Sequence, residues 1–377
     1  MNNNQLIFPN TWNFQHGIHV LGKQTKYAAD QNDVMCLTKT VPGLEKGEPA
    51  PMLAQMKQNY RMPTNYHAPK SEVMSDVPAL PDTEENNYIM KWRDRMGVLS
   101  ANQTIGITEQ KVITDQGLPI TIYTPPFADE ESLPAVVYYH GGAFIGGSIY
   151  ITEDFVRLLA QVAHVRVLSL DFHYAPEFKA PTVLDETYHS LTWIAANAER
   201  LNIIPEQIFV FGESSGGNIA ASVSYLDRLK KTNIVRGQVI AYPIATLNKE
   251  QTDHYDVPHQ TGAGVGPNGL PTFDDVLKLI QDSYLGNTLS DNDPRVSPLA
   301  VPDEIAAQMP ASLVIADEFD PLRKQDYAYA KKLSQAGVNT HYIYYEGMAH
   351  AFLNSVGIVP QASDFAMQAA RWLHANL

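Results

Sequence analysis

The residues with the clearest chemical potential form the pentapeptide GESSG at positions 212–216. It lies between the apolar run QIFVF and the helix-like run NIAASVSYLDRL. A serine at the centre of a sharp turn between a strand and a helix projects its hydroxyl above the sheet, beside the positive end of the helix. The setting therefore predicts that Ser214 is a nucleophile. Ser215 competes for that role, but the flanking glycines favour Ser214, and the backbone N–H of Ser215 is then expected to stabilise an oxyanion.

A second glycine-containing segment, HGGA at positions 140–143, follows the strand-like run AVVYY. Two glycines after a strand allow backbone N–H groups to turn towards one point, which the oxyanion of an acyl-transfer reaction requires. Losing one such donor costs a factor of about 10²–10³ in rate. We therefore expect Gly141 and Gly142 to form an oxyanion hole together with Ser215. The alternative is a glycine turn that merely ends a strand.

The base that activates the serine is expected near the end of the chain. In proteins whose catalytic serine lies in such a turn between a strand and a helix, the catalytic residues run along the chain in the order serine, acid, histidine. The twelve histidines include His341 and His350, which both lie beyond the last candidate acids. His350 follows a strand-like run, where a catalytic base belongs in an open α/β sheet. His341 begins that run and is expected to pack or to face solvent.

Three carboxylates are candidates for the acid that orients this histidine. Asp317, Glu318 and Asp320 all follow the strand-like run SLVIA. The acid must hold the imidazole in one tautomer and stabilise the imidazolium. Spacing alone does not choose among the three.

The elements that position these residues form an alternating pattern from about residue 108. The predicted strands are Gln110–Thr114, Ile120–Tyr123, Ala135–Tyr139, Arg166–Leu170, Ile208–Phe211, Gln238–Tyr242, Ser312–Ala316 and Thr340–Tyr345. The predicted helices among them are Thr152–Ala163, Val183–Arg200, Ser215–Lys230, Asp326–Ala336 and Ala362–Ala375. Apolar strands alternating with helices predict an α/β protein with a mostly parallel sheet covered on both faces. The first two strands are close enough to pair as an antiparallel lead-in.

Two regions depart from this alternation. Residues 1–105 are rich in Pro, Asn, Gln and Met, with an amphipathic helix predicted at Glu84–Val98. We interpret them as an N-terminal extension or cap, and residues 106–377 as the catalytic domain. Residues 248–275 contain the glycine-rich stretch TGAGVGPNGLP. This composition favours either a lid, which would be part of an insertion over residues 248–290, or a long surface loop. A phosphate loop is disfavoured because no Gly-Lys-Ser/Thr follows.

The composition of the chain disfavours some classes of binding partner and some cellular locations. The formal net charge is −14, from 41 acidic and 27 basic residues, which disfavours nucleic acids and anionic membranes. The one cysteine, Cys36, cannot form an intrachain disulfide and fits a reducing compartment. The first residues have no signal-peptide pattern, and no apolar run approaches the roughly 18 residues of a membrane span. We expect a cytoplasmic protein.

Over roughly residues 107 to 377, the chain resembles the bacterial hormone-sensitive-lipase-like carboxylesterases, or family IV esterases, of the α/β-hydrolase superfamily. The family blocks H-G-G-G, D-Y-R-L-A-P-E, G-D-S-A-G-G-N, D-P-x-x-S-P-L, D-P-L-R and G-x-x-H-G-F have counterparts in order. These are HGGAF (140–144), DFHYAPE (171–177), GESSGGN (212–218), DPRVSPL (293–299), DPLR (320–323) and GMAHAF (347–352). The resemblance implies that Asp320 is the triad acid, with Ser214 and His350 as its partners. The departures are Ala143, Glu213, Ser215, Lys324 and Ala351.

The resemblance also implies a function. It implies a serine carboxylesterase that hydrolyses small esters with short to medium acyl chains through an acyl-enzyme, without a metal or an organic cofactor. It further implies a helical cap built by the N-terminal region, and relatives of this kind often form homodimers. Two alternatives stay open: an amidase or peptidase on the same fold, and a small-molecule-binding protein that kept the fold without chemistry.

Overall fold

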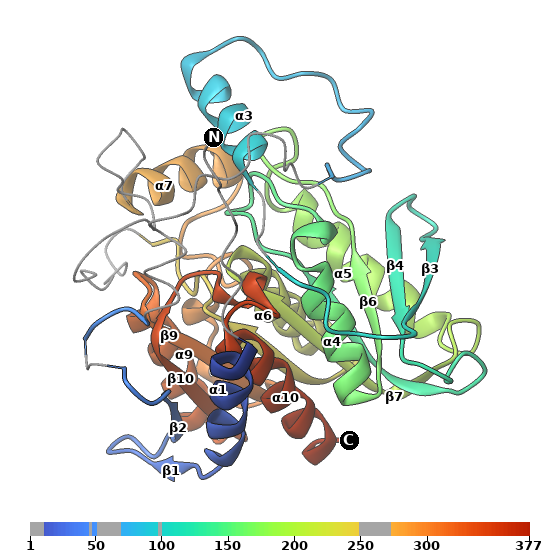
Figure 1. Ribbon diagram of the computed structural model, residues 1–377. Helices are drawn as coiled ribbons and strands as arrows, with labels where there is room; N and C mark the ends of the chain where they lie inside the picture. The colour runs from blue at the N-terminus through green and yellow to red at the C-terminus, as the bar shows by residue number, and fades with distance from the viewer. Residues whose placement is uncertain (1–10, 45–46, 51–68, 97–99, 249–272) are drawn as a thin grey trace, which may run out of the picture.

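The computed structural model describes residues 11–44, 47–50, 69–96, 100–248 and 273–377, and within them a central ten-stranded sheet (Figure 1). The strand order is β1-β2-β10-β9-β8-β7-β5-β6-β4-β3. The strands are β1 (Ala28–Ala29), β2 (Met35–Lys39), β3 (Thr108–Ile113), β4 (Pro119–Thr124), β5 (Leu133–Tyr139), β6 (Arg166–Leu170), β7 (Ile203–Glu213), β8 (Val235–Ala241), β9 (Ala311–Phe319) and β10 (Thr340–Ala349). The α-helices are α1 (Thr11–Lys23), α3 (Glu84–Arg95), α4 (Glu153–Ala163), α5 (Thr182–Ala196), α6 (Ser215–Leu229), α7 (Phe273–Ile280), α8 (Asp303–Ala306), α9 (Arg323–Gln335) and α10 (Pro360–Ala375).

The centre of the sheet is parallel, as the alternation of apolar strands and helices predicts. Strands β2, β10, β9, β8, β7, β5 and β6 pair in parallel, in that order. Strands β3 and β4 pair antiparallel, which confirms the predicted lead-in. Every residue of β6 is buried, because helices cover both faces of a sheet of this kind.

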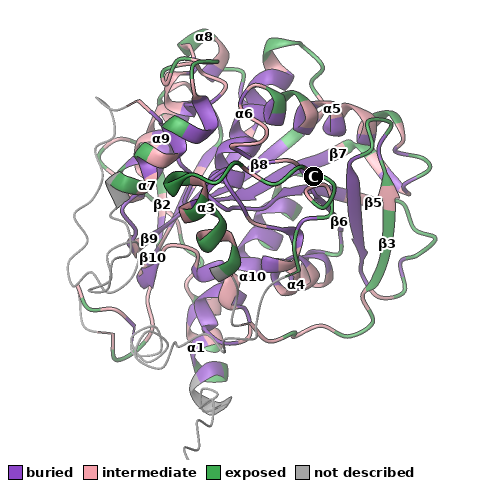
Figure 2. Ribbon diagram, turned by 90° about the horizontal axis from the view of Figure 1, so that it is seen from above, coloured by how far each residue is buried: buried purple, intermediate pink, exposed green. Residues whose placement is uncertain are grey.

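Two layers of helices enclose the sheet (Figure 2). Along β5 and β7 the side chains alternate between the two layers, as strand geometry requires. Tyr138 and Phe211 pack in one apolar cluster with Phe155 of α4 and with α10. Val137 of β5 and Val210 of β7 face the other cluster, to which α5, α6 and α9 contribute. The helix α6, which follows Ser214, is therefore buried against the sheet over most of its length.

The N-terminal region contributes to the sheet as well as to the top of the molecule. Strand β2 pairs with β10 over Met35–Lys39, and α1 packs beside α10. Strands β1 and β2 were not predicted, because two and five residues without clear alternation carry a weak strand signal. The boundary at residue 105 stays a prediction, but residues on both sides of it form one sheet. The predicted helix at Glu84–Val98 is present as α3, from Glu84 to Arg95.

The segment 248–275, for which the sequence leaves a lid or a long surface loop open, lies almost wholly outside the described residues. After it come α7 and a short π-helical segment, Gln281–Leu285. In Figure 1, α3 and α7 both lie at the upper end of the molecule.

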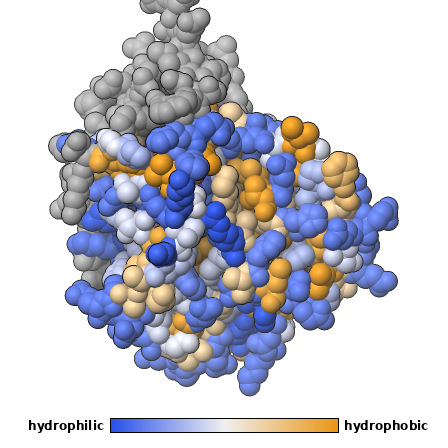
Figure 3. Space-filling view, turned by 60° about the horizontal axis from the view of Figure 1, so that its bottom comes forward, coloured by the Kyte–Doolittle hydropathy of each residue, from blue (hydrophilic) through white to orange (hydrophobic). Residues whose placement is uncertain are grey.

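The surface view in Figure 3 is mainly hydrophilic, with hydrophobic residues in small separate groups. None of the helices in the described ranges combines the length and the apolar composition that crossing a bilayer requires.

Candidate active site

The predicted site residues all follow the ends of strands at one edge of the sheet. Ser214 follows β7, Asp320 follows β9 and His350 follows β10, while His140 follows β5. These strands run parallel in the order β10-β9-β8-β7-β5, so their carboxyl ends lie side by side. Binding sites of open α/β sheets form at that edge.

The turn at Ser214 is sharp. Ser214 has φ 58° and ψ −123°, a strained conformation for a residue with a side chain. Its N–H donates to the carbonyl of Ala241 at 2.9 Å. A Cβ on Gly212 would lie 2.0 Å from the carbonyl oxygen of Gly216, and one on Gly216 would lie 2.1 Å from that of Tyr139. Glycine at both positions is therefore a steric requirement of the turn.

Ser214, His350 and Asp320 form a continuous hydrogen-bonded row. The Ser214 Oγ lies 2.9 Å from Nε2 of His350, and Nδ1 of His350 lies 2.7 Å from Oδ2 of Asp320. The tautomer with its proton on Nδ1 satisfies both contacts, leaving Nε2 to accept from the serine. Asp320 is fully buried, and its second oxygen accepts the N–H of Leu322 at 2.8 Å. Such a row can remove the proton from the serine as it attacks a carbonyl carbon.

The other candidate residues lie elsewhere. Glu318 accepts the N–H of Gly347 at 2.8 Å, and Asp317 is buried in the end of β9. His341 packs edge-to-face against Tyr27, with 4.6 Å between the ring centroids. These contacts agree with the packing role expected for His341 and leave Asp320 as the carboxylate on His350.

The electrostatics of the site involve one carboxyl that sequence reasoning did not assign, Glu213. Burial raises the pKa of Glu213 to about 7, against the opposing effects of the hydrogen bond from Gly141 and the charge of His350. Burial by itself lowers the pKa of His350, but the charge and hydrogen bond of Asp320 and the charge of Glu213 raise it, and the net pKa lies above its ordinary value.

Glu213 also contacts the segment predicted to form the oxyanion hole, whose residues stay a prediction. Its Oε1 accepts the N–H of Gly141 at 2.5 Å, so that N–H donates to a carboxyl group rather than facing Ser214. In the described part of the chain, the N–H groups of Gly142, Ala143 and Ser215 have no acceptor. Ala143, which the sequence prediction did not include because the alanine replaces a family glycine, has a glycine-like φ of 53°. The backbone donors that remain without an acceptor in this part of the chain are thus Gly142 and Ala143 after β5 and Ser215 after β7.

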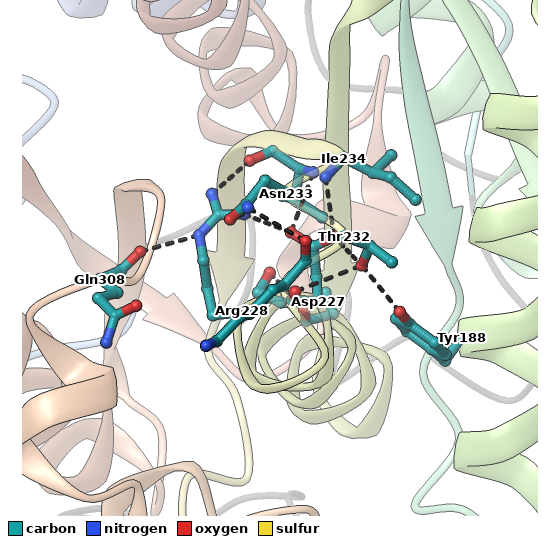
Figure 4. Close-up of polar contacts among 11 residues, drawn as sticks. Tyr188, Asp227, Arg228, Thr232, Asn233, Ile234 and Gln308 are labelled. Atoms are coloured by element: carbon teal, nitrogen blue, oxygen red, sulfur yellow. Dashed lines mark hydrogen bonds and ion pairs between the residues drawn. The ribbon is translucent and has the colours of Figure 1, made fainter.

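The helix behind the nucleophile is held at both of its ends. Near its start, Asn218 Nδ2 donates to the carbonyls of Ile244 at 2.6 Å and Val296 at 2.8 Å. At its end, the buried Asp227 accepts from Thr232 Oγ1 and from the N–H of Ile234, both at 2.8 Å (Figure 4).

A cavity of about 210 Å³ is lined mostly by residues of the N-terminal region, between Pro69 and Met96. Apolar side chains such as Met74, Leu80 and Met90 line it, together with Arg93 and Glu177. Its walls include neither Ser214 nor His350, so we place the chemistry at the hydrogen-bonded row and not in this cavity.

Comparison with known proteins places this site in a family. A family model described as alpha/beta hydrolase fold matches residues 136–354. The arylesterase of Saccharolobus solfataricus is 34% identical over 245 residues, which cover 64% of this chain and 75% of that protein. The chain belongs to the hormone-sensitive-lipase-like (family IV) carboxylesterases of the α/β-hydrolase superfamily, a class of serine hydrolases.

Two further proteins show how far the likeness extends. The ethyl acetate hydrolase of Pseudomonas putida is 28% identical over 278 residues, covering 72% of this chain and 83% of that protein. The structure of the hyperthermophilic esterase of Pyrobaculum calidifontis superposes with a TM-score of 0.67 at 25% identity, covering 87% of this chain and 98% of that one. The fold predicted from the sequence is thereby confirmed.

Proposed function

We propose that this carboxylesterase hydrolyses short- to medium-chain esters with Ser214 as nucleophile, His350 as base and Asp320 as the acid that orients the base. The observation that carries the proposal is the row of contacts of 2.9 Å and 2.7 Å through His350. The relatives named as an arylesterase and an ethyl acetate hydrolase support small esters as the substrate class.

In the first half-reaction, Ser214 Oγ attacks the ester carbonyl carbon and transfers its proton to Nε2 of His350. The carbonyl oxygen becomes an oxyanion that accepts hydrogen bonds from the N–H groups of Gly142, Ala143 and Ser215. The bond to the alcohol then breaks, and His350 protonates the leaving oxygen. Asp320 stabilises the imidazolium throughout.

In the second half-reaction, a water molecule gives one proton to His350 and attacks the acyl carbon. The acyl bond to Ser214 Oγ breaks, and the proton on His350 returns to the serine. The products are the free acid and the unchanged enzyme, and the steps balance without a further reactant.

The test is hydrolysis of p-nitrophenyl esters from acetate to decanoate by the wild type and by Ser214→Ala. We expect activity to be highest on a short acyl chain and to fall by a factor of about 10⁶ in the variant, because nucleophile and base act as a unit. A Ser214→Ala protein with near wild-type rate would refute the assignment. A matching anilide, tested beside the preferred ester, distinguishes an esterase from an amidase.

A further inference from the structure

One arginine of the N-terminal region, Arg93 on α3, meets the loops beside the proposed oxyanion hole. Its guanidinium donates from Nε to the carbonyl of Ile145 at 2.6 Å and from Nη2 to the carbonyl of Ala175 at 2.7 Å. It also forms a bidentate pair with Glu177, at 2.8 Å and 2.7 Å. Below it lies the ring of Tyr174, 4.6 Å from the guanidinium carbon. Both partners of the ion pair are about nine-tenths buried, with side-chain exposures of 11% and 10%.

The carbonyls of Ile145 and Ala175 belong to a closed ring of contacts around the turn at residues 142–146, which we call the oxyanion turn. The N–H groups of Ile145 and Gly146 both donate to the carbonyl of Gly142 at 3.0 Å. The N–H of Ala175 donates to the carbonyl of Phe144 at 2.8 Å. Arg93 therefore joins the outer side of this turn to the loop that follows β6.

The helix itself lies directly on the turn. A Cβ on Gly146 would lie 3.1 Å from Cγ of Arg93 and 3.2 Å from both the Met96 sulfur and the Trp92 ring. The contact is thus tight enough that movement of α3 would be transmitted to the residues after Ala143.

The turn needs such support because its backbone is strained. Ala143 and Phe144 have φ values of 53° and 60°, a left-handed conformation that side-chain-bearing residues adopt at a cost and that surrounding contacts must maintain. A planar guanidinium can reach two carbonyls and a carboxylate at once, whereas an ammonium group cannot match that geometry.

We propose that Arg93 is a positioning residue for ester hydrolysis: from α3, it holds the oxyanion turn so that the N–H groups of Gly142 and Ala143 face the developing oxyanion. This inference rests on the proposed function. It assigns to the N-terminal region a direct part in transition-state stabilisation, beyond covering the site.

Loss of Arg93 should leave the rest of this region attached. Ser71 Oγ and the N–H of Glu72 donate to the Asp171 carboxylate, both at 2.6 Å. This second contact does not involve α3 or the oxyanion turn. Arg93 variants can therefore fold with the segment around Ser71 still attached to the catalytic domain.

The experiment compares Arg93→Lys, Arg93→Ala and Glu177→Gln with the wild type on p-nitrophenyl butyrate. Active sites are counted by stoichiometric phosphonylation of the serine, and the affinity of an alkyl trifluoromethyl ketone reports on the oxyanion hole. We expect kcat per titrated site to fall about 10–100-fold in both Arg93 variants, less than for loss of a whole donor. KM should change by less than about threefold, ketone affinity should fall in parallel with kcat, and Glu177→Gln should show a smaller loss.

Two controls test whether the loss of kcat is specific to the guanidinium of Arg93. Lys91→Ala removes an exposed cation from the same helix and should leave kcat, KM and ketone affinity unchanged. Added methylguanidine should partly restore the kcat of Arg93→Ala, because it supplies the missing guanidinium group. A treatment that only stabilises the fold of this variant should not restore kcat.

Two outcomes would overturn the proposal. One is an increase in KM with kcat intact, which would make Arg93 part of a substrate pocket. The other is a loss of rate fully explained by fewer titratable sites, which would make its role merely structural. Failure of the proposed function looks different, since the wild type itself would then be inactive on every ester.

Discussion

At the residue scale, Glu213 connects the two halves of the site. It directly precedes the nucleophile, accepts the N–H of Gly141, and raises the pKa of His350 through its charge. Burial raises the pKa of the Tyr138 and Tyr242 phenols, and the charge of Glu213 adds to that increase. The carboxyl thus both orients the start of the oxyanion segment and sets the proton affinity of the base.

Replacing Glu213 by Gln should shift the acid limb of the rate profile. The glutamine carbonyl can still accept the N–H of Gly141, but the negative charge is gone, so the pKa of His350 falls. Because the reaction needs neutral His350, the acid limb of kcat/KM should move to lower pH. The measurement is kcat/KM between about pH 5 and pH 9. Glu206→Gln, an exposed site on the same strand, should leave the profile unchanged, and an unshifted limb in Glu213→Gln would contradict this account.

The same variant should gain stability at alkaline pH. The pKa of Glu213 is about 7 in the folded state, above the value of 4.5 for an unperturbed glutamate. Ionisation therefore disfavours the fold, with a penalty that begins above about pH 4.5 and is complete above about pH 7. The Tm of Glu213→Gln should exceed that of the wild type at about pH 8.5 and approach it at about pH 4.5. Equal Tm differences at the two pH values would show that ionisation of Glu213 is not involved.

At the element scale, α6 positions Ser214 and depends on the network at its far end. Asp227 is fully buried and pairs with Arg228, which is 12% exposed. It also accepts N–H groups of Ile234 and Val235 at the start of β8, and Thr232 in turn contacts Tyr188 of α5 at 2.8 Å (Figure 4). One carboxylate thus joins α6, β8 and α5.

Removal of this carboxylate should reduce stability and leave chemistry intact. Asp227→Ala leaves two N–H groups without their acceptor and removes the anionic partner of Arg228, whose guanidinium keeps only its bonds to neutral groups such as the carbonyls of Gln308 and Val235. Breaking a buried pair from one side in this way costs about 3–5 kcal/mol in the free energy of unfolding. Urea denaturation measures that loss. The exposed partner of a surface pair, Asp303, supplies the control, since Asp303→Ala should cost at most about 1 kcal/mol. A kcat per titrated site that falls in Asp227→Ala would show that the network also shapes the site.

At the scale of the whole molecule, a buried ion pair joins the N-terminal strands to the last helix. Lys39 of β2 and Asp364 of α10 are both fully buried, 3.1 Å apart. Lys39 also donates to the carbonyl of Leu21 at 2.8 Å, and Asp364 accepts from Tyr345 at 2.9 Å. Because Tyr345 lies on β10, this pair attaches the N-terminal region to the strand that precedes His350.

Breaking the pair from one side should be more costly than removing it. Lys39→Met strands a buried carboxylate and should lower the free energy of unfolding by about 3–5 kcal/mol, whereas Lys39→Met with Asp364→Leu should recover most of that loss. The exposed Lys26→Met controls for loss of charge in the same region. Additive losses in a double-mutant cycle would show that the two residues do not interact.

The sequence by itself determined the central architecture and the identity of the candidate nucleophile and base. These signals are local: an apolar run, a turn of small residues and a helical run lie within about twenty positions of Ser214, and His350 follows a recognisable strand. Chain order then limited the histidines to those after the candidate acids, which are His341, His350 and His374, and of these only His350 follows a strand-like run. The acid was different, because Asp317, Glu318 and Asp320 share one strand end and resemblance, not spacing, selected Asp320.

Tertiary structure alone decided which groups are already engaged and which residues support the site. Glu213 meets Gly141 across 72 positions, Arg93 meets Ile145 across 52, and Lys39 meets Asp364 across 325. No local pattern encodes such contacts, since each depends on where folding brings two distant segments together and on which side chain reaches an unpaired group there. For that reason the sequence predicted an oxyanion segment, but only the folded chain showed which of its N–H groups already have an acceptor.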